Sequence, residues 1–254
     1  MSRKKRHRAF LLLKLAAILI LLSVAAWYIT GYFSRPVAVR YPEFGITIPV
    51  GYNIHGIDVS RYQKVIDWEE VKAMKVRDVR IGFAFVKATE GIDNVDPQFR
   101  RNWLEATKNE IPKGAYHYFI AGKSGKKQAE NFIDIVHLEK GDLPPVLDIE
   151  ESYGADTKKL REGITDWLKT VEAHYGVKPV IYANINFYNK YLLGKFDEYP
   201  FWVAHYLAPD GPRTEQKWKF WQHSEKGRVN GIRTMVDFNV FAGDSAEFQQ
   251  LLLQ

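Results

Sequence analysis

The feature that most constrains the fold is a regular alternation of strand-like and helix-like segments after residue 53. Short apolar runs bounded by turn residues are typical of buried strands, and longer amphipathic runs are typical of helices. Strands that alternate with helices indicate a parallel sheet, and about eight strands fit a closed barrel better than an open sheet. The predicted strands are 55–60, 79–88, 114–120, 145–150, 179–183, 201–206, 218–223 and 236–238.

The helical segments between these strands carry recognisable start signals. Asp67 is predicted to cap the first helix, and Asp96 the second, with Pro97 in the first turn. The last three predicted strands follow one another with little helix between them, so the repeat is irregular at its end. The predicted helices are 68–75, 97–110, 126–138, 157–175, 186–193 and 244–252.

The N-terminal segment has the pattern of a membrane anchor. Residues 1–9 form a basic leader, and residues 10–33 are almost entirely apolar. A run of about 24 apolar residues is long enough to cross a bilayer. The positive charge keeps the leader in the cytoplasm, which predicts a folded domain on the periplasmic or extracellular side. Small residues at 23–26 also fit a signal-peptide cleavage site, so cleavage is the alternative to an uncleaved signal anchor.

The segment 34–52 is predicted to be a linker with room for one short strand, because it contains three prolines and no helical period. Residues 53–254 then form the folded domain. Seven of the 36 basic residues and none of the 30 acidic residues lie in 1–35, so the basic charge belongs to the N-terminus. The near-neutral domain gives no reason to expect nucleic-acid binding. The chain has no cysteine, which excludes disulfides and thiolate chemistry.

The clearest chemical motif is Val146-Leu-Asp-Ile-Glu150. Alternate side chains of a strand share a face, so Asp148 and Glu150 project together. Two desolvated acids raise each other's pKa, which lets one stay protonated as glycosidic hydrolysis requires. The same spacing also occurs at the start of a predicted helix, at Asp67 and Glu69, so spacing alone is weak evidence. Asp58 and Asp237 lie on other predicted strands, and in such barrels active sites lie at the carboxyl ends of the strands.

Seven short motifs occur in order along the chain: Gly56-Ile-Asp-Val-Ser60, Phe85-Val-Lys-Ala-Thr-Glu-Gly91, Gly114-Ala-Tyr-His-Tyr-Phe119, Val146-Leu-Asp-Ile-Glu150, Trp202-Val-Ala-His-Tyr206, Trp221-Gln222 and Val236-Asp-Phe-Asn239. Together they resemble the motifs of the glycoside hydrolase family 25 lysozymes, also called Chalaropsis-type muramidases. The resemblance covers about residues 54–251 and implies an irregular TIM-like (β/α)5(β)3 barrel. It also implies hydrolysis of the β-1,4 bond between N-acetylmuramic acid and N-acetylglucosamine in peptidoglycan.

The resemblance also assigns residue roles. Glu150 matches the proposed general acid, and Asp148 matches its partner acid. Asp58 and Asp237 match the other two acids of the cleft. A structural role is the alternative for each: Asp58 as the cap of a turn, and Asp237 as a hydrogen-bonded group. The positions expected to line the sugar groove are Tyr116, Tyr118, Tyr182, Trp202, Tyr206 and Gln222.

Three mechanisms remain open from the sequence. A carboxylate nucleophile, an inverting water and the substrate's own 2-acetamido oxygen all fit the motif, and the last is favoured because the substrate carries that group. Two further functions also remain: a non-catalytic cell-wall-binding module and a secreted or phage-type lysin. The expected partners are peptidoglycan glycan strands and, through the N-terminal helix, the membrane, and the protein is expected to be a monomer.

No cofactor or metal is expected. His117, His205 and His223 come from different strands without ligand-type spacing, and we interpret them as core or hydrogen-bonded histidines. Lys87 and Glu90 are interpreted as a salt bridge that shapes the loop after the second strand.

Overall fold

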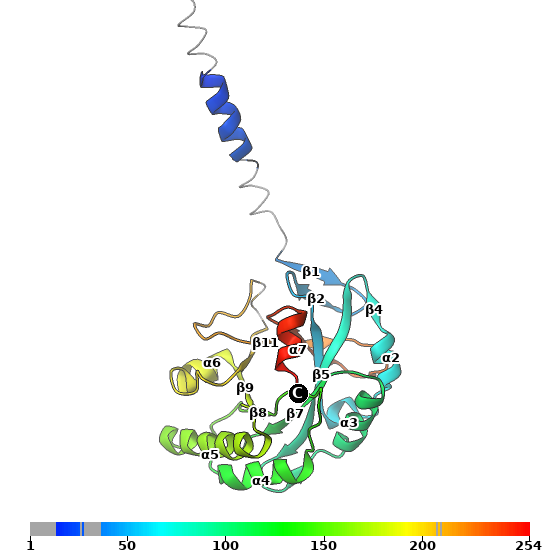
Figure 1. Cartoon of the computed structure of the whole chain (residues 1–254), viewed down its shortest axis with the longest axis vertical. Coiled ribbons are helices and arrows are strands. Elements are labelled where there is room, and N and C mark those ends of the chain that lie inside the picture. Colours follow the sequence, from blue (N-terminus) through cyan, green and yellow to red (C-terminus); the bar gives the residue numbers. More distant parts are fainter. Residues whose placement is uncertain (1–13, 26, 28–36, 207, 209) are drawn as a thin grey trace, which may run out of the picture. The chain divides into compact units, whose positions relative to one another are not determined.

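The computed structural model describes residues 14–25, 27, 37–206, 208 and 210–254 (Figure 1). The chain divides into two compact units, residues 1–37 and residues 38–254. In the first unit, residues 14–25 are helical. No helix among the described residues has the length and hydropathy needed to span a bilayer. The predicted leader 1–9 and residues 10–13, 26 and 28–33 of the predicted anchor lie outside the described residues.

The second unit is built on a closed eight-stranded barrel. Its strands are β3 (His55–Val59), β5 (Val79–Glu90), β7 (Lys113–Tyr118), β8 (Val146–Asp148), β9 (Val180–Asn184), β10 (Phe201–Ala204), β11 (Phe220–Gly227) and β12 (Val236–Phe241). Each strand overlaps one of the eight predicted strands, so that prediction is confirmed. Pairing of β3 with both β5 and β12 closes the barrel.

The direction of the last strand differs from the prediction. Strands β3 to β11 run parallel around the barrel, but β12 is antiparallel to both β11 and β3. A short reversing loop follows β11, and a short loop allows only an antiparallel return. The sequence placed Asp237 at the carboxyl end of a parallel strand. It lies instead near the start of β12, which reaches the same rim because the strand is reversed.

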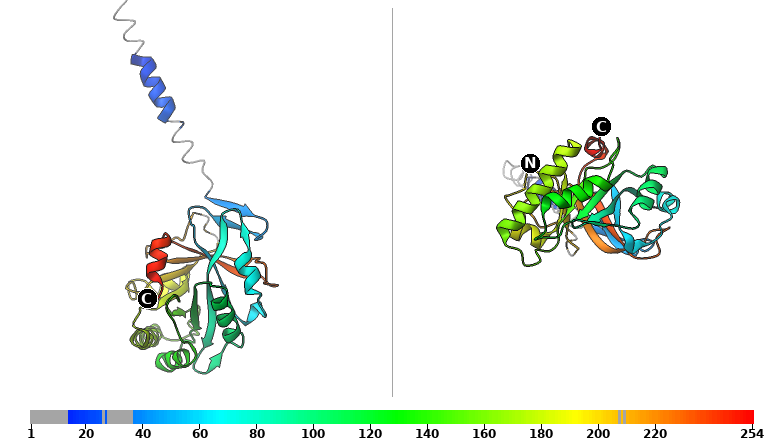
Figure 2. Two further views of the ribbon diagram at one scale, coloured as in Figure 1. Left: turned by 45° about the vertical axis from the view of Figure 1, so that its right-hand side comes forward. Right: turned by 90° about the horizontal axis from the view of Figure 1, so that it is seen from below.

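Helices cover the outside of the barrel, and α4 and α5 lie side by side in Figures 1 and 2. Asp67 caps α2 as predicted, accepting hydrogen bonds from two backbone amides of its first turn. The α3 prediction is wrong at its start, because Gln98 and not Asp96 occupies the cap position. The carboxylate of Asp96 instead accepts the amide of Arg61 at 2.9 Å and that of Gln98 at 2.8 Å, which ties two loops together. The helices are α2 (Trp68–Ala73), α3 (Phe99–Lys108), α4 (Gly125–Ile135), α5 (Thr157–Tyr175), α6 (Ile185–Phe187), η2 (Tyr188–Leu192) and α7 (Ser245–Leu251).

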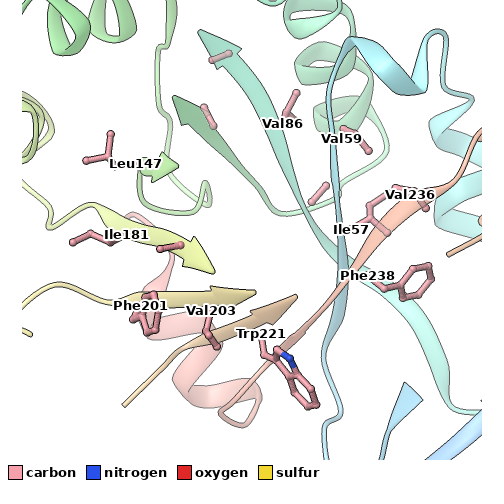
Figure 3. Close-up of a cluster of buried hydrophobic side chains, with 14 of the residues drawn as sticks. Ile57, Val59, Val86, Leu147, Ile181, Phe201, Val203, Trp221, Val236 and Phe238 are labelled. Carbon is pink, nitrogen blue, oxygen red and sulfur yellow. The ribbon is translucent and has the colours of Figure 1, made fainter. Parts of the chain in front are cut away.

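Alternation along the strands sorts the side chains into two layers. Outward residues such as Ile57, Val86 and Leu147 pack under the helices (Figure 3). Inward residues form a separate aromatic cluster that includes Phe83 and Phe85. At the end where β12 finishes, α7 adds Phe248 to this cluster and closes the barrel.

The interior leaves little room beside these rings. A Cβ at Gly56 would lie 2.5 Å from the Phe83 ring, and one at Gly114 would lie 2.7 Å from the Phe85 ring. Both strands therefore need glycine at these points for the aromatic plug to fit. With one end filled in this way, a ligand has access only from the opposite rim.

Part of the segment predicted as a linker is folded. Within 34–52, strands β1 (Ala38–Tyr41) and β2 (Ile46–Pro49) form an antiparallel hairpin. Its Phe44, Ile46 and Ile48 are buried in the outer core. The prolines fit because Pro42 lies in the turn and Pro49 ends the second strand, so neither breaks the hairpin ladder.

Candidate active-site cleft

A cleft of about 510 Å³ opens at the rim of the barrel where the parallel strands end. All ten residues that the sequence singled out line this one cleft. They come from seven strands or the loops just after them, which explains why they are scattered along the sequence. The ten are Asp58, Tyr116, Tyr118, Asp148, Glu150, Tyr182, Trp202, Tyr206, Gln222 and Asp237.

Asp58 is the centre of a buried hydrogen-bond network on the cleft floor. Its Oδ2 accepts the side-chain amides of Gln222 and Asn239, each at 2.8 Å. The Asn239 Oδ1 in turn accepts the indole N–H of Trp202 at 2.8 Å. Burial raises the pKa of Asp58, while the two amide donors act in the opposite direction. The network fixes Asp58 in one orientation.

Asp237 lies directly opposite Asp58 in the antiparallel pair of β12 and β3. Burial raises the pKa of Asp237 to about 9, with a further contribution from the negative charge of Asp58 and the hydrogen bond between the two carboxyl groups. At neutral pH Asp237 is therefore protonated and donates to Asp58. The pair carries one negative charge rather than two.

The proton on Asp237 makes stability depend on pH. Its pKa is higher in the folded protein than the ordinary 3.8, so the stabilisation is complete below about pH 4 and is lost as the pH rises towards 9. The stability of the wild type is expected to fall between pH 5 and pH 9. In Asp237→Asn this fall is expected to be smaller by more than about 1 kcal/mol. Urea unfolding at several pH values measures this. The exposed Asp166→Asn on α5 should keep the wild-type profile, and an unchanged profile for Asp237→Asn would contradict the protonation.

Asp148 and Glu150 lie at different depths. Asp148, the last residue of β8, is buried, whereas Glu150 in the following loop reaches solvent at the cleft mouth. Burial raises the pKa of Asp148 well above its ordinary value, and the charge of Glu150 adds to this. Glu150 is surrounded by protein on most sides of the concave cleft, and this loss of water raises its pKa, with the charge of Asp58 second. The two acids thus form a coupled pair that holds a proton more tightly than isolated carboxyl groups.

One buried oxygen of this pair has no partner. The Oδ1 of Asp148 accepts no hydrogen bond from the residues that the structure describes. Buried polar atoms are rarely left unpaired, and exceptions call for an explanation. This atom is shielded from solvent although Asp148 lines the cleft, so the fold leaves one polar atom beside the cleft without a hydrogen-bond partner among the described residues.

Lys87 and Glu90 form the predicted salt bridge, with 2.7 Å between Nζ and Oε2. The Lys87 ammonium also lies 4.6 Å from the centre of the Tyr118 ring. Both residues line the cleft. The charge of Lys87 acts to lower the pKa of Asp148 and of Glu150, against the effect of burial. Lys87 is thus the cation that offsets the accumulated acids.

The predicted sugar-contacting residues divide into two kinds. Trp202 is only 2% exposed, and its ring stacks on Phe85 with 4.4 Å between centroids. Gln222 accepts the hydroxyls of Tyr182 and Tyr206, each at 2.7 Å. Trp202, Tyr182 and Gln222 are therefore mainly part of the scaffold. Tyr206 is 42% exposed and presents its ring to a ligand.

Three residues at the cleft were not predicted from the sequence: Asn239, which is buried and bonds to Asp58, and Tyr62 and Tyr153, which line the cleft. Asn239 belongs to the motif Val236-Asp-Phe-Asn239, and its spacing from Asp237 places both residues on the inner face of β12. The motif alone did not indicate a role for Asn239. Tyr62 and Tyr153 lie in loops, where no periodic pattern points to them. Tyr153 lies at positive φ, and its hydroxyl is 3.2 Å from that of Tyr118. Both loop tyrosines are exposed and line the cleft.

The histidines pack in the domain as interpreted. His117 is fully buried, with Nδ1 2.7 Å from the Thr89 hydroxyl and Nε2 3.3 Å from the Gln128 side chain. Burial lowers the pKa of His117 to about 3 and that of His223 to about 3. Among the described residues, no group of three or more potential ligands is placed to hold a metal ion.

Comparisons with known proteins agree with this geometry. The model of "Glycosyl hydrolases family 25" matches residues 57–232. The protein YegX of Escherichia coli K12 is 48% identical over 222 residues, covering 87% of this chain and 80% of the relative. Lysozyme M1 of Streptomyces globisporus is 35% identical over 213 residues, covering 78% and 71%.

Solved structures show the same fold. A family 25 glycosyl hydrolase from Bacillus anthracis aligns with a TM-score of 0.73 and 34% identity, over 80% of this chain and 94% of that one. A lysozyme from Streptomyces coelicolor aligns with a TM-score of 0.70 and 35% identity, over 79% and 97%.

Proposed function

The chain belongs to glycosyl hydrolases family 25, and from this premise we propose that it is a lysozyme. It hydrolyses the β-1,4 bond between N-acetylmuramic acid and N-acetylglucosamine in peptidoglycan. The observation that carries the proposal is the gathering of Asp58, Asp148, Glu150 and Asp237 in one cleft, all with raised pKa. Gathering four acids in one cleft destabilises the fold, and acid catalysis is a function that explains why such a cluster is present.

Glu150 is the general acid in this proposal. It lies at the cleft mouth, where a glycosidic oxygen has access, and its raised pKa keeps a proton available near neutral pH. As the bond between the anomeric carbon and the glycosidic oxygen breaks, that oxygen takes the proton from Glu150. The ionised Glu150 then accepts a proton from the water that completes hydrolysis.

Asp148 assists the substrate's 2-acetamido group. The carboxyl group of Asp148, which lines the cleft, accepts the acetamido N–H and turns the acetamido oxygen towards the anomeric carbon. That oxygen bonds to the anomeric carbon as the leaving group departs, and water later opens the ring so formed. Two displacements at one carbon give a product with retained configuration.

Asp58 and Asp237 support the reacting sugar. One negative charge is shared between them on the cleft floor, and amide donors hold Asp58 in place. A fixed negative charge stabilises the positive charge that develops on the sugar ring in the transition state. Their role is electrostatic, and neither donates the proton to the leaving group.

Digestion of purified peptidoglycan tests the proposal. The full-length protein is expected to clear a suspension of cell walls and to release reducing ends on N-acetylmuramic acid. Reducing ends on N-acetylglucosamine would mean that the other glycosidic bond is cut. Binding to walls without release of any reducing end would favour the non-catalytic module.

We also propose, on the sequence pattern of residues 1–33, that the domain is anchored to a membrane and acts outside the cytoplasm. The basic leader followed by an apolar run supports this. Cell fractionation followed by salt and carbonate washes is the test. Recovery of a shortened protein in the soluble fraction would favour cleavage of a signal peptide.

A further inference from the structure

The loop after β8 holds an aromatic residue in a strained backbone conformation. Tyr153 and Gly154 are the central residues of a tight turn, in which the amide of Ala155 donates to the carbonyl of Ser152 at 2.8 Å. Both central residues have positive φ, 48° for Tyr153 and 73° for Gly154, as in a type I′ turn. The first central position of such a turn favours Asn, Asp or Gly, because a bulky side chain strains the backbone there.

Packing within the fold does not explain why a tyrosine occupies this position. Among the described residues, Tyr153 belongs to neither hydrophobic cluster, and it is 52% exposed. Four described residues other than glycine have positive φ, and Tyr153 is the one of them that lines the catalytic cleft. Strained residues tend to gather at functional sites. We therefore looked for the role of Tyr153 in the cleft.

The ring of Tyr153 is held in a fixed place at the cleft wall. Its hydroxyl lies 3.2 Å from that of Tyr118 on β7, the strand that pairs with β8 (Figure 1). The ammonium of Lys87 lies 4.6 Å from the centre of the Tyr118 ring and supports that ring in turn. The loop ends at Asp156, which caps α5. An exposed aromatic ring fixed in this way is a preorganised binding surface.

The order of groups across the cleft indicates which sugar meets this ring. In the proposed function the reacting sugar lies over Asp58 and Asp237, on β3 and β12. Strands β5 and β7 separate β3 from β8 on one side of the barrel, and β9, β10 and β11 separate β12 from β8 on the other. Glu150 protonates the glycosidic oxygen, and Tyr153 follows it three residues later in the same loop. A strand that runs from the floor acids past Glu150 then reaches Tyr153.

We propose that Tyr153 stacks on the N-acetylglucosamine unit that departs with the glycosidic oxygen. The inference rests on the proposed function and adds a specificity-determining residue on its leaving-group side. One face of a pyranose ring carries mainly C–H groups, and packing them on an aromatic face removes apolar area from water. Tyr153 takes no part in proton transfer, and its effect is on binding of the leaving sugar.

The test uses two substrates with the same glycosyl half. One is a peptidoglycan tetrasaccharide that is cut at its central linkage, and the other is the β-fluoride of its glycosyl disaccharide, which has no leaving sugar. Tyr153→Asn removes the ring and suits positive φ. It should raise KM for the tetrasaccharide about fivefold with kcat unchanged, because stacking is lost. Both constants for the fluoride should stay at their wild-type values.

Two further variants separate the ring from the backbone. Tyr153→Phe keeps the ring and should stay within about twofold of the wild-type KM for the tetrasaccharide; a Phe variant as weak as the Asn variant would overturn stacking. Glu110→Asn is the matched control, because Glu110 has a φ of 53°, is exposed and does not line the cleft. It should keep both wild-type KM values.

Thermal unfolding distinguishes a binding role from a structural one. Asn relaxes the turn, so Tyr153→Asn should melt no lower than the wild type. A lower melting temperature together with an unchanged KM for the tetrasaccharide would mean that Tyr153 serves the fold alone. An equal rise in KM for both substrates would also overturn the proposal, because the ring would then act on the glycosyl side.

Calorimetric titration with the tetrasaccharide separates this inference from the proposed function. It is done with Glu150→Gln and Glu150→Gln/Tyr153→Asn, so that the ligand stays intact. If the wild type cleaves neither substrate but the titration shows weaker binding without Tyr153, the sugar contact stands and the lysozyme proposal fails. If the wild type cleaves both substrates and Tyr153→Asn keeps the wild-type KM, the inference fails alone. Neither cleavage nor binding would overturn both.

Discussion

Glu150→Gln is expected to lower kcat/KM on peptidoglycan by about 10³-fold. Gln has the shape of Glu but cannot donate the proton that the leaving oxygen needs. The fold should be unaffected, because the side chain lies at the solvent-exposed mouth of the cleft. Reducing-end release from cell walls gives the rate, and thermal unfolding checks the fold.

A substrate with an activated leaving group identifies the step that is lost. The phenolate of an activated aryl glycoside departs without being protonated. Cleavage of such a glycoside by Glu150→Gln should therefore fall far less than cleavage of peptidoglycan. The control is Glu130→Gln, since Glu130 is an exposed acid on α4 that does not line the cleft. Wild-type rates on peptidoglycan for Glu150→Gln would assign the acid to another residue.

Asp148→Asn is expected to lower kcat by about 10² to 10³-fold, comparable to removal of a group that stabilises developing charge. The wild type should cleave N-acetylated strands much faster than de-N-acetylated strands. In the variant this ratio should collapse, because Asp148 acts through the acetamido group. NMR of the first product should show retained configuration, and an inverted product would contradict the acetamido route.

Relative to the wild type, Asp148→Asn should become more stable as the pH rises. The pKa of Asp148 is raised in the fold, so its stabilisation is complete below the ordinary pKa and is lost as the pH rises through the folded value. Asparagine has no proton to lose, and at alkaline pH it avoids a buried charge, a difference of about 1–3 kcal/mol. Urea unfolding at pH 8–9 measures it. A variant less stable than the wild type there would mean that Asp148 has an unrecognised stabilising partner.

Period-two patterning explains why the site was readable from sequence. Alternate residues of a strand share a face, and in the structure Ile57 and Leu147 pack outward while their neighbours Asp58 and Asp148 line the cleft. The apolar neighbours define the outer core and leave the acids on the inner face. The four acids therefore needed no coordinates to be singled out.

Other assignments depended on contacts between distant segments. Gln222 was predicted to contact sugar, but its amide holds Asp58, 164 residues away, and its oxygen is shared by two tyrosines. The hairpin at 38–49 looked like a spacer because short strands with nearby prolines have little pattern of their own. Its folding depends on burial of Phe44 and Ile46 against the barrel.

The sequence by itself determined the eight strands, the four acids and the family to which the motifs point, because strands follow from local periodicity and motifs follow from residue type. Only the tertiary structure decided that β12 runs in reverse, that Asp237 shares a proton with Asp58, and that Gln222 and Asn239 hold Asp58 in place. Each of these depends on which distant segments become neighbours when the barrel closes, and a linear pattern does not contain that information.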